Sequence, residues 1–204
     1  MIQKGILIIV SGPSGAGKGT ICKELISRDP SITVSVSATT RQPRNGEEEG
    51  ISYHFLTRTR FEDMIRKDGF LEYACVYDNY YGTPKEFVVN QISQGKNVLL
   101  EIDIQGALQV KKKYPEGVFV FILPPSMQTL KDRIVGRGSE TQESLNKRLS
   151  SAFGEIELIK NYDYFIVNDT VKHATDILQA IITAEKCRVD ADIVDIVRKF
   201  KEEK

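Results

Sequence analysis

The first apolar residues of the chain form one unbroken run, from Gly5 to Val10. Because no polar residue interrupts this run, it predicts a strand that is buried on both faces, as in a parallel sheet. A glycine-rich segment follows at residues 11–17, and residues 18–28 then place apolar side chains at helical spacing. The order of strand, glycine-rich loop and helix predicts the first unit of an α/β fold.

The same alternation returns after Pro84. Apolar runs predict strands over residues 97–103, 118–123 and 164–168. The helical spacing of other apolar residues predicts helices between these strands, and Ser126 is a suitable N-cap for one of them. The predicted helices end before Gly95, cover 105–113, 128–135 and 143–160, and run from Val171 to near Phe200.

Residues 33–84 show a different pattern, in which short apolar stretches alternate with polar turns and aromatic residues gather. Short strands are predicted at 32–37, 53–56 and 70–76, with one helix near 60–67. We interpret this region as a small α+β insert with a modest core of its own. The main part of the single domain then comprises about 1–32 and 85–204, and the insert comprises about 33–84.

The composition excludes several classes of protein. The chain has 204 residues, with 28 lysines and arginines and 28 aspartates and glutamates, so its formal net charge is zero and a nucleic-acid coat is disfavoured. No apolar run approaches the ~18 residues that a membrane span needs. The three cysteines and two histidines form no metal-binding or disulfide pattern. We therefore expect a cytoplasmic globular protein that binds neither nucleic acid nor a membrane.

The glycine-rich segment fits the G-x-x-x-x-G-K pattern of a phosphate-binding P-loop, from Gly12 to Lys18. Its glycines allow the backbone to curl so that N–H groups point at phosphate oxygens, and the following helix adds its positive N-terminal end. Lys18 supplies a positive charge for the β- and γ-phosphates. The pattern predicts ATP binding by Gly12, Pro13, Ser14, Gly15, Ala16, Gly17, Lys18, Gly19 and Thr20.

One position departs from the P-loop pattern. The residue after Lys18 is Gly19, where a serine or threonine hydroxyl usually contacts Mg²⁺. Because Mg²⁺ commonly keeps several water ligands, it can be held mainly by water and phosphate. Thr20 is then expected to contact a phosphate instead.

A second cluster places Arg41 and Arg44 three residues apart, beside the hydroxyl groups of Ser37, Thr39 and Thr40. The planar guanidinium group of arginine matches two phosphate oxygens at once. By itself, this pattern fits a phosphate site and a solvated basic loop equally well.

The whole set of motifs resembles the guanylate kinase family. The resemblance extends from Gly5 to about Lys186, in order and with matching spacing. It implies a P-loop core with a five-stranded parallel sheet, a GMP-binding insert and a short lid at about 136–150. It also implies Mg²⁺-dependent transfer of the γ-phosphoryl group of ATP to GMP, with dGMP left open. The runs that match are GPSGAGKGT, TTRQPRNGE, GFLEYA, NYYGTP, LLEIDIQGA, ILPPS, GRGSET and YDYFIVND.

The resemblance assigns roles to residues that match the family motifs. Glu72 matches the acid that reads guanine in the family. A carboxylate suits this role because it accepts hydrogen bonds from the adjacent N1–H and N2–H₂ donors of that base. Adenine presents an acceptor at the same place and is therefore disfavoured. The implied GMP-binding residues are Ser37, Arg41, Arg44, Tyr53, Glu72, Tyr81, Thr83 and Asp103.

Charged residues of the main body complete the implied site. Glu101 and Asp103 alternate onto one face of a predicted strand, at the carboxyl end where α/β sheets bind ligands. Glu101, an aspartate in many relatives, is expected to hold Mg²⁺ through water. Asn168 matches a position near adenine. The implied catalytic residues are Lys18, Arg41, Arg133, Arg137 and Arg148, of which the last three match the lid pattern.

Two other functions fit parts of the pattern. A guanylate-kinase-like interaction module without turnover would share the fold, but such domains typically lack a working P-loop. A kinase for another nucleoside monophosphate would share the core, but Glu72, Ser37 and Thr83 favour guanine. The expected partners are therefore the nucleotides ATP and GMP, with no obligate protein partner.

Overall fold

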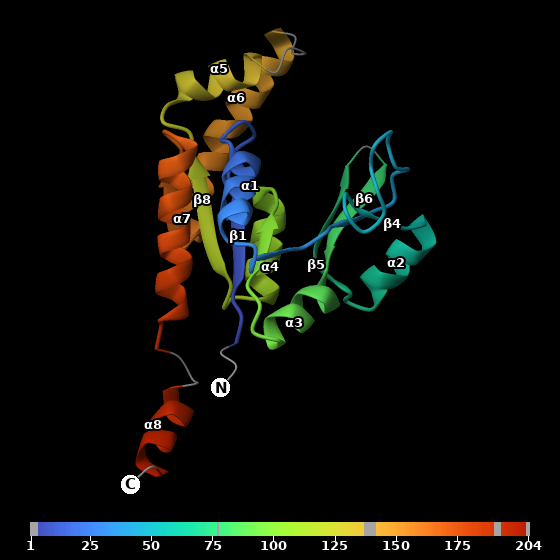
Figure 1. Cartoon of the computed structure of the whole chain (residues 1–204). Helices are drawn as coiled ribbons and strands as arrows, with labels where there is room; N and C mark the ends of the chain where they lie inside the picture. The colour runs from blue at the N-terminus through green and yellow to red at the C-terminus, as the bar shows by residue number, and fades with distance from the viewer. Residues whose placement is uncertain (1–3, 77, 137–141, 190–192, 203–204) are drawn as a thin grey trace.

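A computed structural model of the chain describes residues 4–76, 78–136, 142–189 and 193–202. It has a main body built around one sheet, and an insert with a smaller second sheet beside that body (Figure 1). The N-terminal end of the described chain lies at the end of the body opposite α5 and α6 (Figure 1).

Five parallel strands form the sheet of the main body, as the family resemblance implies. Their order is β2-β7-β1-β8-β9, so β1 lies at the centre. The residues of β2, which the sequence pattern assigns to the insert, pair with β7 in this larger sheet. The strands are β1 (Leu7–Ser11), β2 (Thr33–Val34), β7 (Val98–Glu101), β8 (Val118–Leu123) and β9 (Tyr164–Val167).

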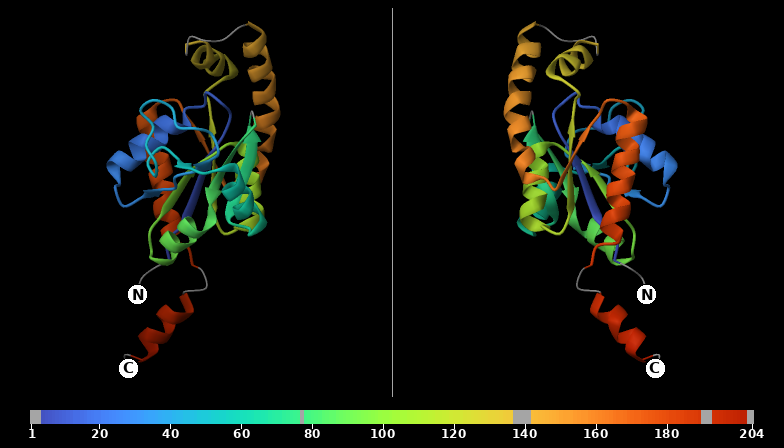
Figure 2. Two further views of the ribbon diagram at one scale, coloured as in Figure 1. Left: turned by 90° about the vertical axis from the view of Figure 1, so that its right-hand side faces the viewer. Right: turned by 90° about the vertical axis from the view of Figure 1, so that its left-hand side faces the viewer.

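Helices cover both faces of this sheet because side chains of a strand alternate between the faces. Along β1, Ile8 and Val10 pack in one core cluster with residues of α1 and α7, which lie side by side (Figure 2). Leu7 and Ile9 pack on the opposite face with α3 and α4. The strand therefore belongs to the middle layer of three, with helices on both sides, which explains its unbroken apolar sequence. The helices are α1 (Lys18–Arg28), α3 (Lys85–Ser93), α4 (Ile104–Lys113) and α7 (Val171–Lys186).

The insert packs around aromatic rings. Phe61 stacks on Phe70 with 4.2 Å between ring centroids, and on Tyr80 at 5.2 Å. Phe61 and Phe70 are fully buried in a cluster that is separate from the core of the main body. The order of its strands is β4-β3-β6-β5. Its elements are β3 (Ala38–Thr39), β4 (His54–Phe55), α2 (Arg58–Arg66), β5 (Phe70–Val76) and β6 (Asn79–Pro84).

Two helices lie above the P-loop end of the body in Figure 1. The first, α5 (Met127–Val135), begins after its predicted N-cap: the Ser126 Oγ accepts the Thr129 N–H at 3.0 Å. The helix predicted over 143–160 is α6 (Gln142–Ile156), which continues into a 3-10 turn at Glu157–Asn161.

The single helix predicted from Val171 to near Phe200 is wrong, because this region contains α7 and a separate helix, α8 (Ile193–Glu202). The buried side of α7 ends at Ile182, and polar residues follow it, so no apolar side continues the packing on the sheet. Figure 1 shows α8 apart from the body, and its Phe200 is 71% exposed. Within the described residues, no helix has the length and apolar character to cross a membrane.

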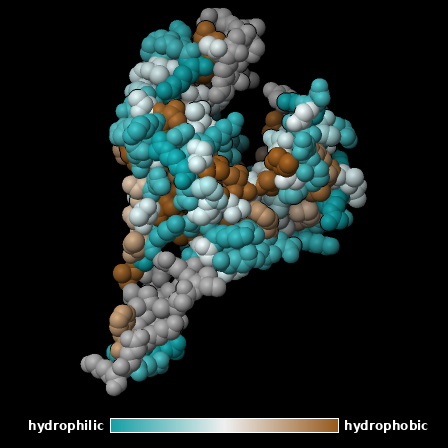
Figure 3. All heavy atoms as spheres, in the orientation of Figure 1, coloured by the Kyte–Doolittle hydropathy of each residue, from teal (hydrophilic) through white to brown (hydrophobic). Residues whose placement is uncertain are grey.

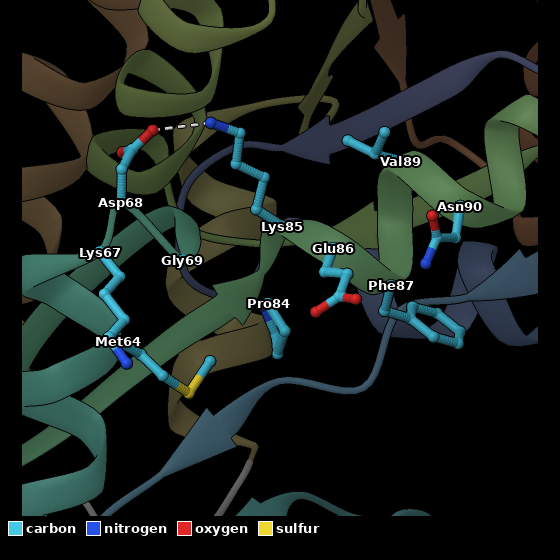
Figure 4. Close-up of a pocket in the computed structure, with 10 residues that line it drawn as sticks. All are labelled: Met64, Lys67, Asp68, Gly69, Pro84, Lys85, Glu86, Phe87, Val89 and Asn90. Carbon is cyan, nitrogen blue, oxygen red and sulfur yellow. Dashed lines mark hydrogen bonds and ion pairs between the residues drawn. The ribbon is translucent and has the colours of Figure 1, made fainter.

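Asp68 joins the insert to the main body. It follows α2 in a left-handed backbone conformation (φ 51°), which is uncommon for a residue other than glycine. Its carboxylate accepts from Lys85 Nζ of α3 at 2.6 Å and from Lys113 Nζ of α4 at 2.7 Å. A hollow of about 740 Å³ lies beside this ion pair, and Figure 4 shows Asp68 and Lys85 at one side of it.

We expect Asp68→Asn to lower the melting temperature at neutral pH. The two lysine ammonium groups lower the pKa of Asp68 to about 2, below the value of 3.8 for a free aspartate. The ionised form therefore stabilises the fold above the unfolded pKa, and this contribution is lost as pH falls from about 4 to about 2.

Thermal unfolding of the parent protein and of Asp68→Asn, measured from neutral pH down to about pH 2, checks that prediction. The difference in melting temperature should shrink toward pH 2. The matched control is Glu86→Gln, which removes a carboxylate from the same hollow. A difference that stays constant with pH would show that Asp68 does not act through its charge.

Candidate functional site

The P-loop connects the end of β1 to the start of α1, and its glycines are required by backbone geometry. Gly12 has φ +143°, and a Cβ atom there would lie 2.3 Å from the carbonyl oxygen of Ile122 on β8. Gly15 and Gly17 have φ values of +92° and +95°, which favour glycine. No side chain caps the N-terminus of α1, so its first N–H groups are available to an anion.

Lys18 lies within the curve of the loop. Its Nζ donates to the carbonyl oxygens of Gly12 at 2.6 Å and Pro13 at 3.3 Å. Burial lowers the pKa of Lys18, while the nearby carboxylates of Glu101, Glu155 and Asp103 oppose that shift. Glu155, on α6, is missed by the sequence analysis because it belongs to no phosphate-binding motif and lies far from the loop in the chain.

Glu101 stands directly opposite Gly19. A Cβ atom on Gly19 would lie 3.1 Å from Glu101 Oε1, so a larger side chain would crowd this carboxylate. Gly19, Lys18, Thr20 and Glu101 line one hollow of about 340 Å³. Carboxylate oxygen is a ligand that Mg²⁺ prefers, and Mg²⁺ needs few protein ligands beside water and phosphate. Glu101 therefore fits a role in holding Mg²⁺. Among the described residues, no three or more His, Cys, Asp or Glu side chains form a group that could hold a metal ion.

Two of the predicted site residues form hydrogen bonds to the backbone of the P-loop. Arg133 Nη1 and Asn168 Nδ2 both donate to the carbonyl oxygen of Ala16, at 3.2 and 2.7 Å. Arg133 Nη2 also donates to the carbonyl oxygen of Asn168 at 3.0 Å. The Oδ1 atom of Asn168 is buried and accepts no hydrogen bond from the residues that the structure describes. Arg137 and the side chain of Arg148, two predicted lid residues, lie outside the described residues.

Glu72 lies on β5 with its carboxylate in a buried position. The side chain is 8% exposed, and Thr83 Oγ1 of β6 donates to its Oε1 at 2.6 Å. Burial raises the pKa of Glu72, and the negative charge of Asp103 raises it further. A Cβ atom on Gly106 would lie 3.0 Å from Glu72 Oε2, so this glycine leaves space for the second oxygen. Thr83 and Gly106 therefore define the position of the carboxylate that the family resemblance assigns to guanine.

Asp103 is not part of a strand, although the sequence pattern extends one to it. The strand β7 ends at Glu101, and Asp103 is the N-cap of α4. Its Oδ1 accepts the Gly106 N–H at 2.7 Å. Both Glu101 and Asp103 nevertheless lie at the carboxyl end of β7, as predicted.

The predicted phosphate-binding residues of the insert also come together. The Arg41 guanidinium lies 5.5 Å from the centroid of the Tyr53 ring, and the rings of Tyr53 and Tyr81 are 6.0 Å apart. The hydrogen bonds of Arg41 with Glu47 and, to a smaller extent, with Tyr81 raise the pKa of Arg41. Arg44 has an exposed side chain, and Ser37 lies half-buried just before β3. The carboxylate of Glu47 also contacts Arg41, a role that the sequence analysis does not assign.

The phosphate-binding loop belongs to the main body, and these residues belong to the insert beside it. Figure 3 shows a hollow between the main body and the insert. The P-loop follows the carboxyl end of β1, and Glu72 and Arg41 come from the strands and loops of the insert. Such an arrangement can bring two phosphate-bearing molecules together while recognising the base of one of them.

The sequence and the structure are similar to those of known proteins. Residues 4–185 match a family model described as guanylate kinase. A guanylate kinase of Clostridioides difficile (strain 630) is 54% identical over 202 residues, which cover 99% of this chain and 98% of that protein. One of Clostridium acetobutylicum is 62% identical over 190 residues, covering 93% and 90%. A crystal structure of guanylate kinase from Anaplasma phagocytophilum has a TM-score of 0.72 and 32% identity, and covers 92% of this chain and 89% of that one.

Proposed function

The chain belongs to the guanylate kinase family, and from that membership we propose which of its residues bind and align the two nucleotides. It is an ATP:GMP phosphotransferase, which transfers the γ-phosphoryl group of ATP to GMP and releases ADP and GDP. A non-catalytic interaction module is not favoured. The observation that carries our assignment is the buried Glu72 carboxylate, held by Thr83, in a chain that also has an intact P-loop.

The P-loop is the proposed site of ATP. The N–H groups of residues 12–20 surround the phosphates, and the ammonium group of Lys18 turns from the Gly12 and Pro13 carbonyl oxygens toward the β- and γ-phosphates. Arg133 and Asn168, through Ala16, hold the loop in position. The unpartnered Oδ1 of Asn168 is a suitable acceptor for the amino group of adenine.

The insert is the proposed site of GMP. Glu72 accepts hydrogen bonds from the N1–H and N2–H₂ groups of guanine, while the hydroxyl groups of Ser37 and Thr83 lie on the O6 side of the base. Asp103 lies near the base and ribose. Arg41, Arg44, Tyr53 and Tyr81 grip the phosphate, which agrees with the contacts that join three of them.

The chemistry then depends on alignment and on charge. The acceptor is already a phosphate oxygen, so no general base is needed, and no covalent intermediate with the protein forms. Lys18, Arg41, Arg133, Arg137 and Arg148 offset the negative charge that gathers as the two phosphates meet. Closure of the insert and the lid, which needs both nucleotides, would exclude water and suppress hydrolysis of ATP.

A magnesium ion is the proposed cofactor. Glu101 is the residue placed to hold it through water, because its carboxylate faces the P-loop across Gly19. When bound, the ion would offset part of the negative charge of the phosphates.

The test is a parallel measurement of ADP formation with ATP, Mg²⁺ and each of GMP, dGMP, AMP, CMP, UMP and dTMP. We expect turnover with GMP to exceed turnover with AMP by at least about a hundredfold, because a buried carboxylate that faces the adenine N1 loses its hydrogen bonds. Preference for another base would overturn the assignment of Glu72. Binding of GMP without turnover would instead favour the interaction module.

A further inference from the structure

The carboxylate of Glu47 holds the guanidinium group of Arg41 at one edge. Arg41 Nη2 donates to Glu47 Oε1 at 2.8 Å, and Arg41 Nη1 donates to Glu47 Oε2 at 3.0 Å. Both side chains are mostly buried, with exposures of 15% for Arg41 and 22% for Glu47. A two-pronged contact of this kind fixes the plane of the guanidinium as well as its position.

The turn that carries Glu47 is itself well anchored. The Glu47 N–H donates to the carbonyl oxygen of Arg44 at 3.0 Å, and the Arg44 N–H donates back to Glu47 Oε2 at 2.8 Å. Gly46, between them, has φ +85°. Glu47 therefore links the two arginines that we assign to the phosphate of GMP.

The remaining donors of Arg41 are arranged for a second acceptor. An arginine side chain has five N–H donors. Glu47 engages two of them, and the carbonyl oxygen of Gln42 takes the other hydrogen of Nη1 at 2.7 Å. The Nε–H and the second Nη2–H lie side by side on the remaining edge of the group, and the hydroxyl group of Tyr81, also assigned to the phosphate of GMP, is a further hydrogen-bond partner of Arg41. That edge has the spacing that suits two oxygens of a phosphate.

We propose that Glu47 is a positioning residue for the acceptor nucleotide: it holds Arg41 by one edge so that the other edge, beside Tyr81, is presented to the phosphate of GMP. This inference rests on the proposed GMP site. The alternative is that Glu47 occupies the place of the phosphate and competes with it. The second edge of the guanidinium argues against competition, because Glu47 does not use its donors and Arg41 can contact Glu47 and a phosphate at the same time.

The substitution Glu47→Gln tests the proposal, because the two roles predict effects of opposite sign. Glutamine has nearly the same size, but its amide nitrogen would face an N–H of Arg41 and break the two-pronged contact. We expect the KM for GMP to rise at least about tenfold, and kcat at saturating GMP to change less than about threefold. If Glu47 competed with the phosphate, the loss of its negative charge would lower the KM for GMP.

The matched control is Glu48→Gln, which removes the exposed neighbouring carboxylate and should leave both constants unchanged. Binding of guanosine provides a second readout, since it lacks the phosphate. Guanosine should bind Glu47→Gln as it binds the parent protein. Equal weakening of guanosine and GMP would show that Glu47 only maintains the fold of the insert, and would overturn the proposal.

A double-mutant cycle with Arg41→Lys shows whether Glu47 acts through Arg41. In the Arg41→Lys background, Glu47→Gln should cause little further rise in the KM for GMP. Independent, additive losses would overturn the proposal, as would an unchanged or lower KM in the single variant. Failure of the parent protein to phosphorylate GMP would instead contradict the proposed function, so the two failures are distinguishable.

Discussion

Replacing Lys18 with alanine is expected to lower kcat by about 100- to 1,000-fold, the range found when one preorganised donor to a transition state is removed. The Lys18 ammonium lies within the P-loop, 2.6 Å from the carbonyl oxygen of Gly12. Its contribution grows as negative charge develops on the transferring phosphoryl group. The affinity for GMP, for which we propose a site on the insert, should change little.

Steady-state kinetics with ATP and GMP, together with direct titration of GMP, would measure both effects. The control variant is Lys172→Ala, which removes an ammonium group from an exposed ion pair with Asp176 on α7. It should leave kcat unchanged. A Lys18→Ala protein that turns over at half the parental rate would remove this lysine from the transition state.

Replacing Glu72 with glutamine should lower kcat/KM for GMP by about a hundredfold and narrow the preference for GMP over AMP. The amide nitrogen of glutamine is a donor, so one N–H of guanine would face another donor in a buried site. Thr83 Oγ1 and the space left by Gly106 hold this side chain in place, so it has little freedom to turn away.

The pH dependence of kcat/KM for GMP provides a second test of Glu72. Burial raises the pKa of Glu72, and only the ionised form accepts both hydrogen bonds from guanine. The kcat/KM of the parent protein for GMP should therefore fall as pH decreases toward that raised pKa. This acidic limb should be absent from the profile of Glu72→Gln.

Stability provides a further check on Glu72. A carboxyl group whose pKa is raised by folding weakens the fold once it is ionised, so Glu72→Gln should not lower the melting temperature at neutral pH. Glu62→Gln, on the exposed side of α2, serves as the control and should keep the preference for GMP. An unchanged kcat/KM for GMP in Glu72→Gln would refute the assignment.

The sequence by itself determined the features that depend on neighbouring residues. The unbroken run of β1 required burial on both faces, and the structure encloses it between two pairs of helices. The glycines of the P-loop allow the backbone to curl, and three of them have positive φ angles in the structure. The N-cap Ser126 marked the start of α5. Local sterics and hydrogen bonding act over a few residues, so short motifs carry this information.

Only the tertiary structure decided which distant groups meet. The strand at β7 ends at Glu101 because Asp103 turns to cap α4, although the apolar pattern alone would extend the strand. The residues of β2 join the main sheet because β7 offers a free edge there. Glu155 approaches Lys18 from a helix late in the chain, and Asp68 meets lysines of two other helices. Such partners are brought together by packing across the whole fold, since charge interactions depend on distance in space and not on distance along the chain.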